Sequence, residues 1–192
     1  DLVFDPRIIQ TLPFWESASE ADKEQYLRNA GDLHRSFRAA DVFIGATEQL
    51  AAAARARGKP AIVHPNLLHP HLVSIGGVLR RFRSWIAQKP LITYMSGSAT
   101  HDLDFLKIAA PLSRVLDRHP EARLMVCGFV HPGPMFPAND PRIVRLPFVD
   151  WQVLPWIQAM ARVNVAPLST LDHFTHSKSA VKFFEAAILG VP

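Results

Sequence analysis

Short apolar runs alternate with amphipathic stretches along this chain of 192 residues, and the alternation predicts its fold. Runs typical of buried strands occupy residues 42–46, 61–64, 91–95, 123–128, 143–146 and 163–166. Between them, apolar positions recur at helical spacing over residues 26–40, 105–116 and 151–161. Strand, helix and strand at this spacing form the unit of a parallel sheet covered by helices. We therefore predict a doubly wound α/β protein.

Helix ends are marked by residues with a known preference for those positions. Residues 17–20 match a capping box, and Thr47 is a candidate N-cap for an alanine-rich helix that Gly58 ends. Pro111 lies inside the 105–116 pattern and predicts either a kink or an early helix start. Gly190 is expected just past the end of the last helix, because glycine tolerates the left-handed conformation there.

The last helix carries the most informative side chains, and we expect it to begin near Ser177. Lys178, Lys182 and Glu185 would then line one stripe, beside an apolar face made of Val181, Phe184 and Ile188. A helix N-terminus with two ammonium groups attracts phosphate, and a carboxylate one turn on can accept hydrogen bonds from ribose hydroxyls. The alternative is a surface helix with an ordinary Lys–Glu pair.

Residues 67–90 break the rhythm with Pro70, two adjacent glycines and four basic residues, and we expect a domain boundary there. Val78, Phe82, Trp85 and Ile86 give this segment an apolar face. It is interpreted as an interdomain helix with a solvated basic side, while peripheral contact with an anionic membrane is the alternative.

Bulk composition fits a soluble globular protein. Hydrophobic residues make up 48% of the chain, charged residues 20%, and the formal net charge is +4. The single cysteine, Cys127, favours a reducing cytoplasm. We expect no bound nucleic acid, no metal and no cofactor; spacings typical of zinc sites, hydrolase elbows and Walker loops do not occur in the sequence. The chain lacks an initiator methionine and stops after a helix, so we expect an internal fragment.

Ligands on such sheets bind outside the carboxyl ends of the strands. Gly97, Gly128 and the pair Phe148–Val149 follow three of the predicted strands. Asp102 and Asp104 have the spacing of a metal-binding acid pair, but they directly precede an apolar helical stripe. Carboxylates there complement the helix dipole, and we favour that interpretation.

The order of these features resembles family 4 of the retaining glycosyltransferases, which have the two-domain GT-B architecture. In chain order, the resemblance rests on residues 1–5, 40–47, 65–66, 94–102, 124–128, 164–168 and 178–192. It implies two Rossmann-like domains, the first only partly present and the second nearly complete. Residues 1–70 would end the acceptor-side domain, 71–89 would link the domains, and 90–192 would bind the nucleotide sugar.

The resemblance also implies roles for individual residues. Lys178 and Lys182 are the expected catalytic groups, which would neutralise the leaving diphosphate. The remaining expected donor-binding residues are Gly97, Ser98, Gly128, Phe148, Val149, Ser177, Ser179 and Glu185. Family members carry two glutamates. Glu185 matches the second, which holds the ribose, whereas the first, which touches the donor sugar, would fall at Ser177, and Asp172 or His173 is a candidate replacement. Many members also grip the diphosphate with an Arg/Lys pair, whose places are roughly those of Ser98 and Asp104 here, and Lys178 and Lys182 are the expected replacements for that pair.

We accordingly expect a cytoplasmic enzyme, at the inner face of the membrane if the acceptor is lipid-linked. It would move a sugar from a nucleotide diphosphate to an acceptor hydroxyl with retention, in cell-surface polysaccharide or glycan synthesis. The alternatives are a nucleotide-sugar epimerase of the same architecture and a catalytically silent nucleotide-binding relative. We expect the fragment alone to be inactive.

Overall fold

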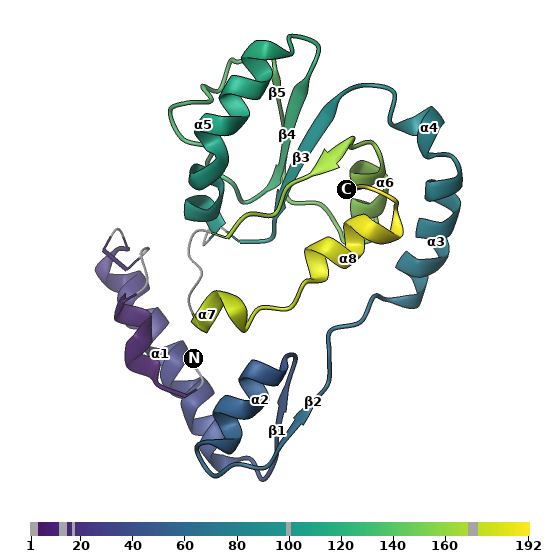
Figure 1. Cartoon of the computed structure of the whole chain (residues 1–192). Coiled ribbons are helices and arrows are strands. Elements are labelled where there is room, and N and C mark those ends of the chain that lie inside the picture. Colours follow the sequence, from purple (N-terminus) through teal and green to yellow (C-terminus); the bar gives the residue numbers. More distant parts are fainter. Residues whose placement is uncertain (1–3, 12–14, 17, 99–100, 169–172) are drawn as a thin grey trace. The chain divides into compact units, whose positions relative to one another are not determined.

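The computed structural model in Figure 1 describes residues 4–11, 15, 16, 18–98, 101–168 and 173–192, with only the backbone of 173 and 174. The chain divides into two compact units. The first comprises Asp1–Asn66 and Leu171–Ser179, and the second comprises Leu67–Thr170 and Ala180–Pro192. Both contain parallel strands and helices, so the chain is an α/β protein.

The first unit holds a short parallel sheet. Its elements are the 3₁₀ helix η1 (Pro6–Thr11), α1 (Glu20–Ala39), β1 (Phe43–Gly45), α2 (Glu48–Arg55), β2 (Ala61–Val63) and α7 (His173–His176). The cap of α1 differs from the prediction: Ser19, rather than Ser17, accepts a hydrogen bond from the Asp22 amide. Ser17 lies outside the described residues. Thr47 caps α2 as predicted, since its hydroxyl accepts from the Leu50 amide at 3.4 Å.

Aromatic rings hold this first unit together. Phe4, Phe37 and Phe43 form a triangle with ring centroids 5.1–5.7 Å apart. The outer face of the two strands is open, because Ile44 and Ile62 are 66% and 57% exposed. Only part of this small sheet is therefore buried.

The second unit is built on a four-stranded parallel sheet. Its strands are β3 (Leu91–Ser96), β4 (Arg123–Gly128), β5 (Ile143–Leu146) and β6 (Val163–Asn164), in the order β5-β4-β3-β6. Leu91 pairs with Arg123 and Ser96 with Gly128, so β3 and β4 match along their whole length. β5 adds beyond β4, and β6 pairs with the opposite edge of β3.

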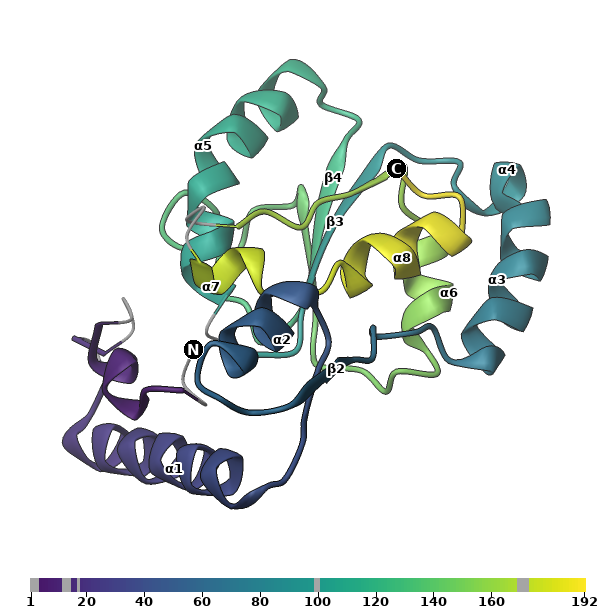
Figure 2. The ribbon, with the colours of Figure 1, turned by 60° about the horizontal axis from the view of Figure 1, so that its bottom comes forward.

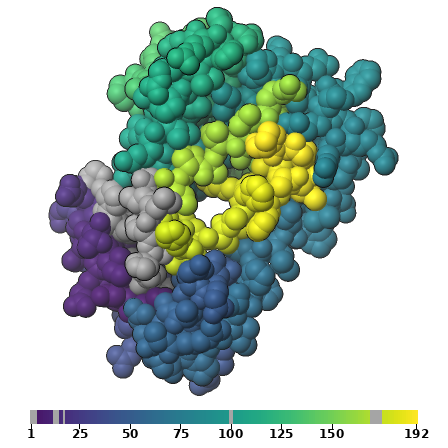
Figure 3. All heavy atoms as spheres, viewed as in Figure 1, coloured from purple at the N-terminus to yellow at the C-terminus, as the bar shows by residue number. Residues whose placement is uncertain are grey.

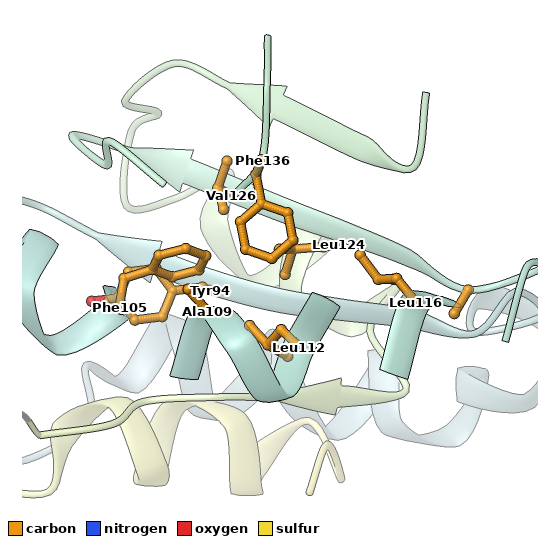
Figure 4. Close-up of a cluster of buried hydrophobic side chains, with 9 residues drawn as sticks. Tyr94, Phe105, Ala109, Leu112, Leu116, Leu124, Val126 and Phe136 are labelled. Carbon is orange, nitrogen blue, oxygen red and sulfur yellow. The ribbon is translucent and has the colours of Figure 1, made fainter. Parts of the chain in front are cut away.

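Helices cover both faces of this sheet, as the two views in Figures 1 and 2 agree. α5 (Asp102–Arg118) lies on one face and continues through Pro111 as a single helix. Its inward residues pack on alternate residues of β3 and β4 and on Phe136 (Figure 4). Tyr94, Phe105 and Phe136 form a chain of edge-to-face rings in this core.

The opposite face is covered by α6 (Leu154–Ala159) and α8 (Val181–Ile188), with α3 (Pro70–Arg81) and α4 (Arg83–Ile86) outside them. The yellow C-terminal residues lie directly against the teal residues of α3 in Figure 3. The shared core comprises Leu79, Ala159, Ala161, Ala186, Leu189 and Val191. Residues 71–89, predicted as a linker, thus pack as helices of the second unit.

The expected apolar face of α3 and α4 packs only in part: Ile86 is half-buried against the core around Leu79, but the other three residues are not. Leu72, Gly76 and Leu79 are buried, whereas Val78, Phe82 and Trp85 are exposed. Arg83 also turns inward, and its guanidinium donates to the carbonyl of Ala161 at 3.0 Å. Among the residues described, no helix combines the length and apolarity needed to span a membrane.

The terminal helix starts later than predicted, at Val181 instead of Ser177. Residues 177–179 are held by the first unit: Thr47 donates to the Ser177 carbonyl, and Asn66 donates to the Ser179 hydroxyl. These bonds replace a helical turn. Lys178 therefore does not share a helical stripe with Lys182. Phe184, expected in the core, is 43% exposed, whereas Gly190 ends the helix at φ 70° as predicted.

Candidate functional site

A pocket of about 210 Å³ opens at the carboxyl ends of the parallel strands in the second unit. Side chains and backbone from β3, β4, β6, α6, α8 and the loop after β5 line it. The lining residues are Met95, Ser96, Gly97, Cys127, Gly128, Phe148, Val149, Trp151, Leu154, Gln158, Asn164, Val165, Lys182 and Glu185. The pocket is mostly apolar with a few polar groups, which is usual for small-molecule sites.

Strand topology explains why a pocket forms here. From β3 the chain adds β4 and β5 on one side and then returns to add β6 on the other. The connecting helices α5 and α6 consequently lie on opposite faces of the sheet (Figure 1). A crevice forms where they diverge, next to β3. Thr93 on β3 donates to the side-chain oxygen of Asn164 on β6 at 3.0 Å, which fixes the junction.

Gly128 closes the end of β4 against β3. Its φ is 92°, and a Cβ at this position would overlap the carbonyl oxygen of Ser96. Only glycine fits this backbone without strain. Just past β3 and at the end of β4, Gly97 and Gly128 therefore line the pocket with backbone that carries no side chain.

Lys182 reaches the pocket from the first turn of α8. Its ammonium lies 5.5 Å from the ring centroid of Tyr94, a distance typical of a cation–π contact. Burial, with Asp104 and Asp102 nearby, raises the pKa of Tyr94 above its ordinary value. The phenol stays protonated and donates to the His101 carbonyl at 3.0 Å. The Tyr94 ring, held by this hydrogen bond, thus positions the Lys182 ammonium.

Glu185 lies three residues after Lys182 and lines the same pocket. Burial raises the pKa of its carboxyl above the ordinary value, and the Lys182 ammonium offsets part of this rise. The two charges on neighbouring positions of one helix provide an anion-binding group and a hydrogen-bond acceptor side by side.

Phe148 lies at the mouth of the pocket and stacks on Phe129. Their ring centroids are 5.4 Å apart with an interplanar angle of 23°, and both rings are about half exposed. Cys127 lies deeper, where burial raises the pKa of its thiol; the thiol donates to the Pro147 carbonyl. An exposed flat aromatic surface beside an apolar floor suits a planar ring.

The structure brings together six of the ten residues expected at the site: Gly97, Gly128, Phe148, Val149, Lys182 and Glu185. Ser98 lies next to the pocket, where its amide and carbonyl bond the Ser96 hydroxyl. Ser177, Lys178 and Ser179 belong to the first unit. The predicted stripe of two lysines and a glutamate is thus reduced to Lys182 and Glu185.

Asp102 and Asp104 occupy the first turn of α5 as expected, and both bind histidines. Asp104 bonds the His101 ring at 2.8 Å, and Asp102 bonds both the ring and the amide of His131. Within the described ranges, no group of three or more His, Cys, Asp or Glu residues is arranged to hold a metal ion. Asp172 and the side chain of His173, the candidates to replace the missing glutamate, lie outside what the structure describes.

Sequence reasoning missed much of the rest of the lining, apolar and polar. Met95, Trp151, Leu154, Gln158, Asn164 and Val165 were not singled out. Trp151 and Gln158 lie within the predicted helix after β5. Their position after the carboxyl end of a strand was the one feature of the sequence that could have marked them as site residues. That signal cannot tell which side of a helix faces the crevice.

Comparisons with known proteins add little to this geometry. No family model matches the sequence, and none of the curated proteins matches it. Among solved structures, the trehalose-6-phosphate synthase OtsA aligns with a TM-score of 0.46 and 14% identity. The alignment covers 85% of this chain and 44% of that one, so the chain spans less than half of that protein. Similarity at this level assigns neither a family nor a reaction to this chain.

Proposed function

We propose that the pocket of the second unit holds the nucleoside diphosphate of a nucleotide sugar. The chain would be part of a retaining glycosyltransferase of family 4 that transfers the sugar to an acceptor hydroxyl. The observation that supports this proposal is the placement of Lys182 and Glu185 in one pocket at the carboxyl ends of parallel strands.

Each group has a distinct task in this proposal. The Lys182 ammonium, positioned by Tyr94, neutralises the diphosphate as it leaves. The Glu185 carboxylate accepts hydrogen bonds from the ribose hydroxyls. Backbone at Gly97 and Gly128 allows close approach of the phosphates, and Phe148 with Val149 contacts the base. The acceptor hydroxyl then attacks from the face that the diphosphate leaves, without an enzyme nucleophile, so catalysis consists of positioning and charge stabilisation.

The wider context is part of the same proposal. The acceptor would be a glycan or a lipid-linked sugar in polysaccharide synthesis at the cytoplasmic side of a membrane. Lys178, Ser177 and Ser179 are further proposed contacts, with Lys178 as a second cation for the diphosphate.

One observation favours a second candidate, a catalytically silent nucleotide-binding relative. Lys182 is the single lysine or arginine among the described residues that line the pocket. A leaving diphosphate is usually stabilised by more than one positive group or a metal ion. Binding of a nucleotide sugar without turnover by the full-length protein would support this candidate over the transferase.

Titration calorimetry with UDP and GDP tests the site. Replacing Lys182 with alanine should weaken binding of the nucleoside diphosphate about tenfold or more, because a charge-assisted contact is lost. Glu185→Ala should weaken binding of the diphosphate and of the matching nucleoside alike. Lys107→Ala, at an exposed position on α5, is the matched control and should change nothing. Equal affinities for all variants would contradict the proposed site.

Turnover of the full-length protein tests the role of Lys178. If it is the second cation, Lys178→Ala should reduce turnover about a hundredfold. A rate near that of the unsubstituted protein would restrict the catalytic charge to Lys182.

A further inference from the structure

A second pocket of about 190 Å³ lies beside the first, within the same unit. The two pockets share Trp151, Leu154, Gln158 and Glu185. The other residues lining the second pocket are Leu67, Leu68, His69, Leu72, Pro155 and Val181. It is therefore an adjoining space with a lining of its own, bounded by the start of α3, the start of α6 and the first residue of α8.

Gln158 is the most informative residue of the shared wall. The residue is only 3% exposed, yet its side-chain amide makes no hydrogen bond to any residue in the described part of the chain. Among the described residues, Arg83 Nε is the one side-chain polar atom that is fully enclosed and has no hydrogen-bond partner. The Gln158 amide also has no partner, so its polar atoms are not fully enclosed. They must therefore face open space, and Gln158 lines both pockets. A buried amide without a partner is costly unless a ligand or water satisfies it.

Trp151 forms an aromatic wall that neighbouring rings hold in place. The His69 and His71 rings lie 4.9 and 6.0 Å from it, both edge-on. His69 Nδ1 accepts a hydrogen bond from the His71 amide at 3.2 Å. The proton of the neutral His69 ring is therefore on Nε2, which can donate. The His69 Nε2–H donor, the Gln158 amide and the Glu185 carboxylate thus belong to residues that line the same pocket as the Trp151 indole.

The two pockets differ in charge. Lys182 lines the first and not the second, and no lysine or arginine is found among the described residues that line the second. An anionic group would meet Glu185 there without compensation, so the second pocket selects a neutral ligand. The His69 and His71 rings meet Trp151 edge-on, so these three rings do not form the parallel stack that a flat base would extend. The near-parallel aromatic pair is at Phe148, in the first pocket.

We propose that the second pocket binds a neutral pyranose ring. The apolar C–H face of the sugar would lie on Trp151, and its hydroxyls would bond Gln158, Glu185 and His69 Nε2. The ring can come from the sugar of the donor or from a saccharide acceptor. That choice of source rests on the proposed function, whereas the pyranose site itself does not.

Ligand-observed saturation-transfer NMR on the chain tests the site, with glucose, galactose, mannose and N-acetylglucosamine as probes at millimolar concentrations. At least one sugar should receive saturation. Gln158→Leu, which keeps the volume but removes the amide, should reduce that signal fivefold or more. Val181→Phe, which fills only the second pocket, should do the same. Trp85→Ala, which removes an exposed tryptophan outside both pockets, should leave it unchanged.

Calorimetry with UDP and GDP on the same variants separates this inference from the proposed function. Val181→Phe should leave nucleotide binding within twofold, because Val181 lines only the second pocket. Sugar binding without nucleotide binding supports the pyranose site and contradicts the transferase. Nucleotide binding without sugar binding, or loss of the sugar signal on adding uridine or guanosine, overturns the pyranose site.

Competition identifies the source of the sugar. If a nucleotide sugar abolishes the signal of the free sugar while its diphosphate does not, the pocket holds the donor's sugar. If both ligands bind together, the pocket holds a separate saccharide. Thermal unfolding of each variant checks that it is folded. A folded Gln158→Leu protein that binds the sugar as well as the unsubstituted protein would contradict the proposal.

Discussion

The two units follow the same strand–helix–strand rhythm but bury their sheets to different extents. In the second unit β3 and β4 are covered on both faces, and Thr93, Tyr94 and Leu124 are at most 1% exposed. In the first unit β1 and β2 leave Ile44 and Ile62 mostly exposed. Parallel sheets are normally buried on both faces, and two strands alone are marginally stable. The first unit should therefore open more easily than the second.

The same difference explains where the site lies. A crevice at strand ends needs helices that leave a strand pair on opposite faces. β3 and β6 meet this condition, with α5 on one side and α6 on the other (Figure 1). β1 and β2 are joined by α2 alone. Coverage of the sheet and formation of a pocket thus have one topological cause.

The largest expected effect comes from matched phenylalanine truncations. Phe105→Ala should cost about 3–5 kcal/mol in the second unit, because its ring is fully buried between Tyr94 and Phe136. Phe37→Ala in the first unit should cost about 1–2 kcal/mol, since that ring is half-buried. Hydrogen exchange in urea, read separately for each unit, measures both. Similar costs would remove the contrast between the units.

A second pair of substitutions, Gly128→Ala and Gly77→Ala, compares two glycines of the second unit. Gly128→Ala should cost about 2–4 kcal/mol, through the positive φ and overlap with the Ser96 carbonyl. It should also abolish ligand binding, because it distorts the pocket floor. Gly77→Ala on α3 meets open space and should stabilise by about 0.5–1 kcal/mol. Urea unfolding and calorimetry measure the two effects. A Gly128→Ala protein of ordinary stability would show that the end of β4 is not rigid.

Much of the second unit could be predicted because its signals are local. Buried parallel strands are continuous apolar runs, and glycine marks the strand and helix ends at Gly128 and Gly190. The order of the strands in the sheet is not local, but few arrangements satisfy right-handed crossovers. The fold class therefore follows from the sequence almost directly.

The candidate site was less predictable because tertiary hydrogen bonds interrupt a local pattern. Residues 177–188 have helical spacing throughout, and this spacing predicts that Lys178 and Lys182 share a stripe. Hydrogen bonds from Thr47 and Asn66 hold residues 177–179 in another conformation. Those partners lie more than 110 residues away in the sequence. Gln158 was missed for a related reason, because a buried glutamine in a helix looks like any polar surface position.

Thr47 offers a smaller test, in the first unit. Thr47→Ala removes the N-cap of α2 and the bond to the Ser177 carbonyl, and it should cost about 1 kcal/mol. Protease cleavage should become faster at Lys178, because the segment loses one of its ties. Thr47→Ser keeps the hydroxyl and should restore both stability and protection. Cleavage at the same rate in all three proteins would show that this bond does not hold the segment.

The smallest expected effect is a pH-dependent difference in stability between the unsubstituted protein and Glu185→Gln, expected in the second unit alone. The pKa of Glu185 is raised above its ordinary value of 4.5 by burial. A carboxyl with a raised folded-state pKa disfavours folding when ionised. This penalty is fully present above the folded-state pKa, shrinks as the pH falls, and is absent below the unfolded value. Lowering the pH from 7 to 4 should therefore stabilise the unsubstituted protein relative to Glu185→Gln.

Lys182 supplies the control for this pH effect. Its ammonium lowers the pKa of Glu185, so Lys182→Met should raise that pKa further and enlarge the pH-dependent difference. Hydrogen exchange of amides in β3 and β4, measured across the pH range, reports the second unit alone. The same exchange in α1 and α2 should not respond to either substitution. Two outcomes would contradict this expectation: a difference in stability between the unsubstituted protein and Glu185→Gln that is constant with pH, or one that favours the unsubstituted protein more toward neutral pH. Either result would mean that the Glu185 carboxylate is solvated rather than held against the apolar wall of the pocket.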